Sequence, residues 1–424
     1  MATEANKEVA QASGGCPFHS DTLKTRPTRK TARAPAGNLS EKVTPLKKDA
    51  NGTWQVRGYH EAKTLLRADG TRQAGFMAEQ VSLLPDTMRP PVLFQEGETH
   101  HDQRTKTAKF FTPITTDKNY RGFMTAYADE LINDLKTKGH ADLSELSMQL
   151  AVQVAAQVVG LTDSHTRGMA RRIEAFFRPY KARSAVGRLL GDLRNQLRVA
   201  RFFFLDVQPA VRARRREGRE DLITHLLEEG YSPTEILTEC ITFAAAGMVT
   251  TREFISVSAW HLLEHPDLKS RYLKADEKER HHILHELLRL EPVVGNLLRR
   301  AEREIALESE GQTFTIAQGD LIDFDIYRIN ADESAVGQEP LTFCPERERA
   351  RGVQPYALSF GDGHHRCPGA FIAIQETDIF LTRLLALDDL RLEHPPELSY
   401  SEVVKGYEIR DVRLRLGGRR GNIG

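Results

Sequence analysis

Cys367 is the residue of this 424-residue chain whose surroundings point most directly to chemistry. It lies near the C-terminus in the segment Phe-Gly-Asp-Gly-His-His-Arg-Cys-Pro-Gly-Ala, residues 360–370, and a helical pattern begins just after it. A thiolate is a strong, soft ligand for iron, but it has to be held deprotonated. Backbone N–H groups of a glycine-bearing loop and of a helix N-terminus would stabilise the negative sulfur. The two glycines before Cys367 also let the loop bend tightly and let a flat ligand approach the backbone.

Two other interpretations of this cysteine have to be weighed. A free cysteine in an ordinary turn is often buried and behaves as a small hydrophobe. A zinc site could use His364, His365, Cys367 and Cys344. Zinc sites prefer paired ligands at short, regular spacings, however, and no second Cys-x-x-Cys or His-x-x-x-His lies nearby. An iron ligand is therefore favoured over zinc.

The segment resembles the cysteine-ligand loop of the cytochrome P450 superfamily. That family pattern has Phe, a glycine or small residue, Gly, a basic residue, Cys, an apolar residue or Pro, and Gly at fixed spacings. Seven residues fill these places: Phe360, Gly361, Gly363, His365, Cys367, Pro368 and Gly369. The resemblance implies a single, mainly α fold with a large helical body and a small β region. It also implies haem b as cofactor, with the Cys367 thiolate as axial ligand of the iron.

A run of small residues, 244–251, lies on a long helical pattern upstream of the cysteine. It is similar to the family's central distal helix, in which Ala246, Gly247 and Thr250 match. Small residues would let the backbone approach the haem, and Gly247 would permit a local widening of the helix. The resemblance implies that Thr250 hydrogen bonds a water and supports proton delivery. The alternative is that the small residues only allow close helix packing and that Thr250 bonds to the preceding turn.

Val249 occupies the place where the family usually has an acidic residue. Valine can neither relay protons nor bind water. Either the proton path uses Thr250, Thr251 or Glu253 together with waters, or the chemistry is not ordinary hydroxylation. Peroxygenases of the superfamily place an arginine near this position and lose the threonine, and neither change is found in this chain.

Two further segments contain candidates for binding the haem propionates. Arg-Arg-Ala-Glu-Arg-Glu, residues 299–304, resembles the family segment whose arginine binds one propionate, so that Arg299 and its neighbour Arg300 are both candidates. Arginine presents a planar fork that matches a carboxylate. His100 and Arg104 are spaced i, i+4 on one helical face and could grip the other propionate. His365 would add a contact beside the cysteine. In isolation, His100 and Arg104 would pass for ordinary surface residues.

Glu286 and Arg289 form an i, i+3 pair on another predicted helix. An exposed pair of this kind contributes less than about 1 kcal/mol. The resemblance implies instead a buried, structural pair that is joined by a later basic residue, for which Arg349 or Arg351 is the candidate.

The chain pattern is mainly helical. Ser232 reads as an N-cap, followed by a long helix over 233–263 that stops before a proline. Residues 54–56 form a candidate strand, and two strand patterns within 314–324 flank a turn at 317–320, which predicts a hairpin.

Composition places the chain among globular proteins, with 40% hydrophobic and 28% charged residues. Lys+Arg and Asp+Glu both number 59, so the charge gives no reason to expect nucleic acid or an anionic membrane as partner. Residues 1–38 lack the apolar run of a membrane anchor and are expected to be a disordered leader to one haem-thiolate domain, residues 39–424. The four cysteines fit no disulfide framework, which favours the cytoplasm.

By resemblance, the protein is a monooxygenase that inserts one atom of O2 into a small organic substrate. The sequence contains neither a dinucleotide-binding glycine motif after a strand nor a multi-cysteine iron–sulfur pattern. Electrons are therefore expected from a separate ferredoxin or flavodoxin and its NAD(P)H reductase, docking near Arg366. The regions around 83–94 and 160–216 are expected to cover the substrate pocket. A peroxide-driven or atypical haem-thiolate oxidase and a non-enzymatic haem sensor are the rival functions.

Overall fold

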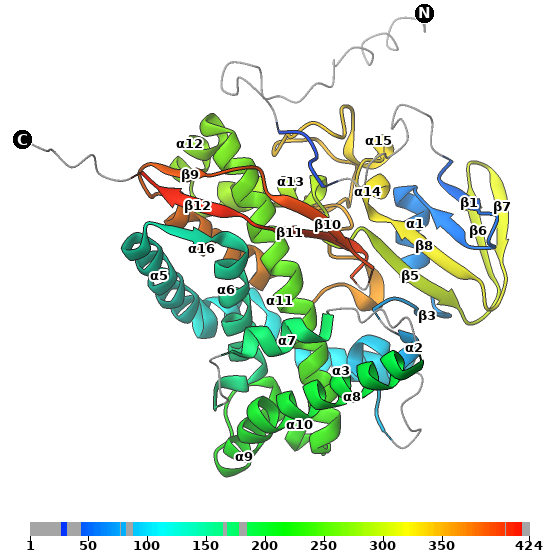
Figure 1. The fold of residues 1–424 in the computed structure, drawn as a ribbon. Coiled ribbons are helices and arrows are strands. Elements are labelled where there is room, and N and C mark those ends of the chain that lie inside the picture. Colours follow the sequence, from blue (N-terminus) through cyan, green and yellow to red (C-terminus); the bar gives the residue numbers. More distant parts are fainter. Residues whose placement is uncertain are drawn as a thin grey trace, which may run out of the picture.

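The computed structural model describes residues 27–31, 44–76, 78–81, 88–163, 168–177, 185–402 and 404–417. The helices gather into one large body, and a smaller region of strands lies at one side of it (Figure 1). The mainly α fold with a small β region is thereby confirmed. Within these ranges, no helix combines the length and the apolar character needed to cross a membrane.

The helices and strands follow one another with few long connections. The helices are α1 (Tyr59–Arg67), α2 (Ala78–Val81), α3 (Gly97–Thr107), α4 (Pro113–Thr115), α5 (Arg121–Lys138), α6 (Leu143–Val159), α7 (Met169–Phe177), α8 (Ala185–Phe202), α9 (Gln208–Arg216), α10 (Leu222–Glu228), α11 (Pro233–Glu264), α12 (Pro266–Lys274), α13 (Glu277–Leu290), α14 (Ile326–Ile329), α15 (Glu333–Val336) and α16 (Ala370–Leu385). The strands are β1 (Leu46–Lys48), β2 (Trp54–Val56), β3 (Thr71–Gln73), β4 (His140–Asp142), β5 (Asn296–Ala301), β6 (Ile305–Ser309), β7 (Gln312–Ile316), β8 (Leu321–Asp325), β9 (Leu390–Leu392), β10 (Glu397–Ser401), β11 (Gly406–Arg410) and β12 (Arg413–Leu416).

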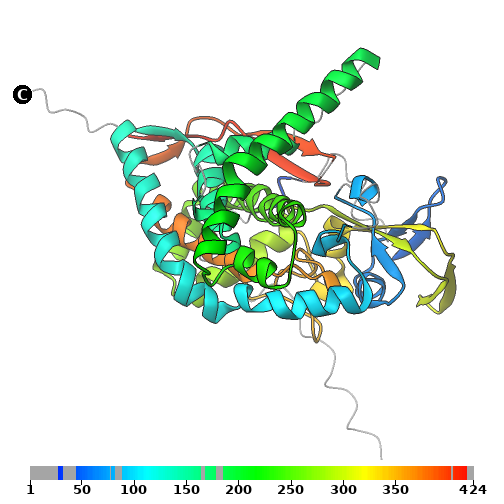
Figure 2. The same ribbon diagram turned by 90° about the horizontal axis from the view of Figure 1, so that it is seen from below.

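Helix α11 forms the spine of the helical body and is seen nearly end-on at its centre in Figure 2. The predicted start is confirmed, because Ser232 and Glu235 form a capping box and Pro233 occupies the first helical turn. The helix ends at Glu264, before Pro266, one residue beyond the expected end. It packs against α6 on one side and α16 on another. Because α16 follows Cys367 directly, the small-residue run and the cysteine loop are held on neighbouring elements.

The largest sheet has the strand order β1-β2-β8-β5-β3, with β2 and β8 parallel. The strand expected over 54–56 is confirmed as β2. The hairpin prediction over 314–324 is wrong: β7 pairs with β6, whereas β8 pairs with β5 and β2. The turn itself forms, since the N–H of Asp320 donates to the carbonyl of Ala317 at 3.1 Å. Burial explains the split, because Ile322 and Phe324 of β8 have no exposed surface and need strands on both sides.

Residues 27–31 lie against the body, so the leader expected over 1–38 is not loosely packed there. Thr28 forms a β-bridge with Thr342. Thr31 is buried, and its N–H donates to the buried carboxylate of Glu291 at 3.1 Å. Cys344, two residues after Thr342, is disulfide-bonded, contrary to the expectation of no disulfide. The rest of the expected leader up to residue 38 lies outside the described residues.

Candidate active site

The loop that carries Cys367 is closed by one backbone hydrogen bond, from the N–H of Cys367 to the carbonyl of Phe360 at 2.9 Å. Gly361 and Gly363 adopt positive φ values of 68° and 66°, a backbone conformation that costs other residues energy. A Cβ at Gly363 would lie 2.1 Å from the carbonyl oxygen of Leu66 at the end of α1. The loop therefore needs glycine at this position both for its turn and for its contact with α1.

The sulfur of Cys367 lies at the start of α16 and is half-buried. Burial raises the pKa of the thiol, while the N–H of Gly369 and the charges of Arg104 and Arg366 act in the opposite direction. Bound iron would hold the sulfur as the thiolate, because a coordinating thiol loses its proton. The surroundings thus provide a hydrogen-bond donor and two cations for a negative sulfur.

The zinc interpretation receives no support from the geometry. His364 lies 3.3 Å from Asp69, and His365 bonds to Glu96, so that the two imidazoles have separate partners. Among the side chains that the structure describes, no group of three or more His, Cys, Asp or Glu could hold a metal ion. Cys367 is therefore left as a single-thiolate ligand.

Helix α3 brings His100 and Arg104, which are spaced one turn apart, to the cysteine loop. The ring of His100 stacks on that of His365, with centroids 4.2 Å apart and planes at 19°. The guanidinium of Arg104 donates to the carbonyl oxygen of Arg366, next to the cysteine. Burial, followed by the charges of His365 and Arg104, lowers the pKa of His100 to about 4. His100 is therefore neutral at pH 7, and both histidines can serve as hydrogen-bonding groups.

Strand alternation separates Arg299 from Arg300, because neighbouring side chains of a strand point to opposite faces. Arg299 is buried, and burial lowers its pKa to about 10. Its Nη1 has no hydrogen-bond partner among the residues that are described. Arg300 points the other way, and its Nη1 donates to the carbonyl of Gly319 at 2.8 Å. The prediction that left Arg300 open as a propionate ligand is corrected, and Arg299 alone faces the site.

Glu96 is a member of this cluster that the sequence reasoning missed. Its Oε2 lies 2.9 Å from Nε2 of His365, and its Oε1 lies 3.8 Å from Nη1 of Arg299. Burial would raise the pKa of Glu96, but the hydrogen bond and charge of His365 and the charge of Arg299 lower it on balance. No spacing rule connects a residue before α3 with β5, so only the fold reveals this contact.

The cluster of Arg104, His100, Arg299 and His365 fits a ligand that carries carboxylates. The clearest sign is the buried Nη1 of Arg299, which has no hydrogen-bond partner among the described residues and only the long contact of 3.8 Å with Glu96, so there is a free donor for a further carboxylate. A cavity of about 440 Å³ adjoins the cluster and is lined in part by Glu96, His100 and His364. Haem b presents two carboxylates at one edge and an iron that Cys367 can ligate, so the residues present fit this cofactor.

On α11, Ala246 and Thr250 are more exposed than their neighbours and share one face of the helix. The hydroxyl of Thr250 donates to the carbonyl of Ala246 at 2.5 Å. A hydroxyl has one proton to donate and two lone pairs, so Thr250 can only accept further hydrogen bonds in this arrangement. Val249 is buried beside it.

Gly247 does not face the same way as Ala246. A Cβ added to it would lie 3.6 Å from Cβ of Ala155 on α6, an ordinary contact distance, so this position is turned toward α6. The helix is regular α-helix at this point, without the local widening that was expected. The expected widening is therefore corrected, and a role of Gly247 in cofactor binding stays a prediction.

Thr251 and Glu253 lie on buried faces of α11. Glu253 accepts from the N–H of Ile409 at 2.7 Å and pairs with Arg410 at 2.7 Å, which ties α11 to β11. A carboxylate engaged in this way cannot act as the distal acid, so the catalytic assignment of Glu253 is corrected. The hydroxyl of Thr251 bonds to Glu376 on α16, whose pKa is raised well above its usual range by burial. Glu376 was not singled out from the sequence.

The buried pair of Glu286 and Arg289 forms as expected, with an Oε2–Nε distance of 2.7 Å. Arg289 also donates to the carbonyls of Asn330 and Pro340. The third member is Arg347, whose Nε lies 3.4 Å from Oε1 of Glu286, and not Arg349 or Arg351. This network locks α13 to the segment that leads to the cysteine loop.

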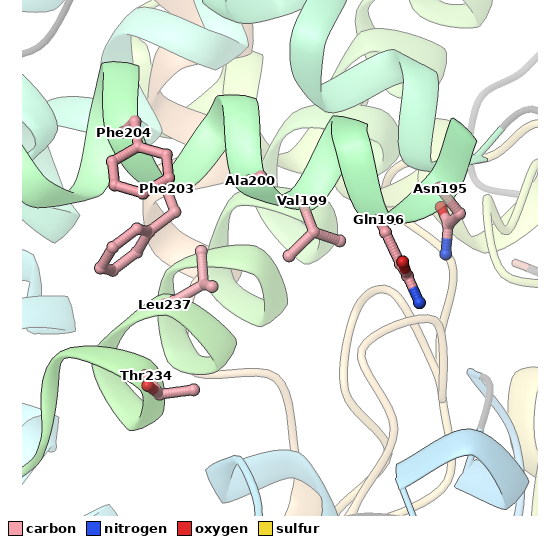
Figure 3. A pocket seen from close by; sticks show the side chains of 8 residues that line it. All are labelled: Asn195, Gln196, Val199, Ala200, Phe203, Phe204, Thr234 and Leu237. Atoms are coloured by element: carbon pink, nitrogen blue, oxygen red, sulfur yellow. The ribbon is translucent and has the colours of Figure 1, made fainter. Parts of the chain in front are cut away.

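A cavity of about 360 Å³ lies between α8 and the first turns of α11 (Figure 3). Val199, Phe203 and Leu237 provide apolar walls, and the amides of Asn195 and Gln196 add polar groups. Its α8 wall falls within 160–216, the region expected to cover the substrate.

Known proteins resemble this chain in both sequence and fold. The family model described as Cytochrome P450 matches residues 281–400. The Biotin biosynthesis cytochrome P450 of Bacillus subtilis (strain 168) is 26% identical over 341 residues, which cover 78% of this chain and 82% of that protein. The 20-oxo-5-O-mycaminosyltylactone 23-monooxygenase of Streptomyces fradiae is 28% identical over 292 residues, or 68% of this chain and 63% of that protein.

Solved structures match over most of the chain. P450BioI, solved with an acyl carrier protein that carries hexadec-9Z-enoic acid, superimposes with a TM-score of 0.71 at 24% identity, over 88% of this chain and 95% of that one. CYP109E1 from Bacillus megaterium, in complex with corticosterone, gives a TM-score of 0.71 at 20% identity, over 88% and 94% of the two chains. With the cysteine loop, the buried Glu286–Arg289 pair and this fold, the chain belongs to the cytochrome P450 superfamily of haem-thiolate oxidoreductases.

Proposed function

We propose that the chain is a haem b monooxygenase that inserts one oxygen atom of O2 into an apolar small organic molecule. The observation that carries the proposal is the thiol of Cys367, with the N–H of Gly369 donating to its sulfur, together with the buried Nη1 of Arg299, which has no hydrogen-bond partner among the described residues. The thiol suits an iron ion and the guanidinium suits a carboxylate, and haem carries both. When bound, haem contributes the activation of dioxygen, which a cysteine ligand favours.

The residues of the cradle would divide the binding of the cofactor between them. Cys367 would hold the iron through its thiolate. His100 and Arg104 would bind one propionate, and Arg299 with His365 the other. Four polar groups from α3, β5 and the cysteine loop fix the position of the cofactor relative to α11.

Thr250 would hold the water that delivers protons on the distal side. Because its own proton is donated to Ala246, it accepts a hydrogen bond from that water and so orients it. The side chain of Val249 cannot take part, and Glu253 is held by Arg410. Protons would therefore arrive through ordered waters that end at Thr250, and not from a carboxylate of the neighbouring turn.

The substrate and the electron donor are the finer parts of the proposal. The cavity between α8 and α11 has apolar walls with two amides, which suits an apolar body that carries a hydrogen-bonding group. The structural neighbours were solved with a steroid and with an acyl chain on a carrier, both largely apolar ligands. A separate ferredoxin or flavodoxin, reduced by its NAD(P)H reductase, would dock near the exposed Arg366.

Spectroscopy of the purified holoenzyme tests this function. The reduced protein with carbon monoxide is expected to show the red-shifted Soret band of thiolate-ligated haem, and Cys367→Ala is expected to lose it. Cys240→Ala is the control, because that free cysteine is buried on α11 and should leave the band unchanged. A histidine-type spectrum in the unaltered chain would overturn the assignment.

A second candidate is a peroxide-driven or atypical haem-thiolate oxidase. It is favoured by Val249 in the acidic place together with the engaged carboxylate of Glu253, which leave α11 without a free distal acid next to Thr250. Two assays separate these functions. A monooxygenase should form product with a redox partner and NADPH, whereas a peroxide-driven oxidase should form it with hydrogen peroxide alone. A haem sensor would give neither.

A further inference from the structure

Glu239 is a buried carboxylate on α11 that none of the roles above uses. It is 1% exposed. Its Oε1 accepts two hydrogen bonds, from the N–H of Val92 at 2.9 Å and from Nε2 of Gln103 at 3.0 Å. Its Oε2 has no partner among the residues described here. Three elements therefore meet at one side chain: α11, the segment before α3, and α3 itself.

Glu235, one turn earlier on α11, binds the same segment. Its Oε1 accepts from the N–H of Arg89 at 3.0 Å, while its Oε2 caps the helix at Ser232. The guanidinium of Arg89 lies over the ring of Tyr231, 4.6 Å from its centroid, and adds a hydrogen bond to the carbonyl of Glu229. Residues four apart lie on one helical face, so the two carboxylates form a row that points at the segment.

The sequence of the segment makes these two contacts decisive. Residues 89–92 read Arg-Pro-Pro-Val, and a proline has no N–H. Arg89 and Val92 therefore contribute the only two backbone donors of this stretch, and Glu235 and Glu239 take both. Gln95 closes the segment on itself, with its Nε2 donating to the carbonyl of Pro90 at 2.7 Å.

We propose that Glu235 and Glu239 form a carboxylate latch that fastens residues 88–95 to α11, and that Glu239 is the positioning residue for this segment, which lies in a region expected to cover the substrate pocket. The inference rests on the proposed function, because the segment covers the pocket only if haem lies beneath α11. Glu239 also accepts a hydrogen bond from Gln103, one residue before Arg104, so the latch would help to position α3 and its Arg104.

The setting of Glu239 makes the latch sensitive to pH. Burial raises its pKa to about 7, and the bonds from Gln103 and Val92 offset only part of that effect. The titratable groups that feel its charge are the buried thiol of Cys240 and the phenol of Tyr231, which both remain neutral. Glu235 lies one turn before Glu239 on α11, and it accepts a hydrogen bond from the N–H of Arg89. Among the residues that the structure describes, no cation pairs with Glu239, so its ionised form would be better solvated when the latch is open.

Amide exchange at Val92 in the full-length holoenzyme tests the latch directly. Rates are divided by the intrinsic rate of an unprotected amide at each pH, from 5.5 to 8.5. In the open state Glu239 would titrate near its ordinary value, so the opening constant should rise about tenfold per pH unit up to about pH 7 and then level off. Glu239→Gln keeps the acceptor but cannot ionise, so its profile should be flat.

Glu239→Leu should raise Val92 exchange about tenfold at every pH, because the N–H of Val92 loses its acceptor; tenfold corresponds to about 1.4 kcal/mol, within the cost of leaving a buried donor unsatisfied. Thr238→Val is the matched control, because that hydroxyl bonds only within the helix, to the carbonyl of Glu235. Equal Val92 exchange in the unaltered chain and in Glu239→Leu would overturn the proposal. So would a pH profile of Glu239→Gln that matches the unaltered chain, a result that stands even if the leucine variant misfolds. Amide exchange is measured without turnover. A histidine-type carbon monoxide spectrum would therefore refute the proposed function, while the exchange data would still decide whether the latch exists.

Discussion

Glu96 places its carboxylate 2.9 Å from the imidazole of His365, inside the group of side chains that would bind the propionates. A carboxylate of the chain would thus share its partners with a propionate of the proposed haem. Like charges at close range repel, and a partly buried site screens them less than water does. This relationship leads to a first prediction about cofactor retention.

Glu96→Gln should slow haem loss. The amide keeps the shape of the side chain but removes a negative charge that competes for His365 and Arg299. Relief of about 1 kcal/mol corresponds to roughly a fivefold slower transfer of haem to an acceptor protein. Glu98→Gln is the control, since that residue is exposed two positions away. Faster haem loss from Glu96→Gln would mean that Glu96 is needed to orient Arg299.

Arg299→Ala and Arg300→Ala should behave differently although they are neighbours. Loss of the buried guanidinium of Arg299 should speed haem dissociation at least tenfold, because a charged hydrogen bond is worth about 1.5 to 3 kcal/mol. Arg300 bonds to Gly319 on the other face of β5, so its variant should retain haem like the unaltered chain. Equal rates of haem dissociation from the two variants would show that the face of β5 on which an arginine lies does not decide haem binding.

Thr250→Ala should uncouple the reaction, so that NADPH is consumed while peroxide is released and product falls. The hydroxyl that accepts from the proton-carrying water is lost, whereas Thr250→Ser keeps it and should preserve coupling. The ratio of product to NADPH measures this effect. Unchanged coupling in Thr250→Ala would reduce Thr250 to the packing role in which it merely bonds to Ala246.

Glu253→Gln provides the contrasting case on the same helix. Its buried carboxylate accepts from the N–H of Ile409 and pairs with Arg410, so the variant should lose stability because the charge in this ion pair is removed. The midpoint of urea unfolding should fall, while the ratio of product to NADPH stays the same. A loss of coupling without a loss of stability would restore Glu253 to the proton path.

The cysteine loop, the long helix and the i, i+4 pair on α3 could be predicted because each depends on residues that are close in the sequence. The box of Ser232 and Glu235, the small residues around Ala246, and the spacing of His100 and Arg104 are local rules that the fold then keeps. Arg299 and Arg300 could be told apart only when the strand and its partners were known.

The features that escaped prediction arise from contacts between distant segments. Arg347 joins Glu286 across 61 residues, and Glu253 meets Arg410 across 157. Gly247 matched the family pattern, but its direction depends on where α6 packs. The false hairpin between β7 and β8 shows the same limit, since a turn signal does not say which strand becomes the neighbour.

The stability of the fold should depend on pH through Glu239. Its pKa is raised to about 7 in the folded chain, against 4.5 for an ordinary glutamate, so the folded state holds this proton more tightly than the unfolded state. The resulting stabilisation is fully present below about pH 4.5 and is lost as the pH rises through 7. Between pH 5 and pH 8 the unaltered chain should lose about 2 to 3 kcal/mol relative to Glu239→Gln, which has no proton to release.

Urea unfolding of the two proteins at both pH values measures this difference, because all other groups titrate alike in the pair. Glu235→Gln is the comparison within the same latch. Its carboxylate has a lowered pKa, since the hydrogen bonds from Ser232 and Arg89 outweigh the effect of burial. The contribution of Glu235 is thus present at neutral pH and lost only on acidification, so the two glutamates should give opposite pH trends. A constant difference between the unaltered chain and Glu239→Gln from pH 5 to pH 8 would contradict a neutral, buried Glu239.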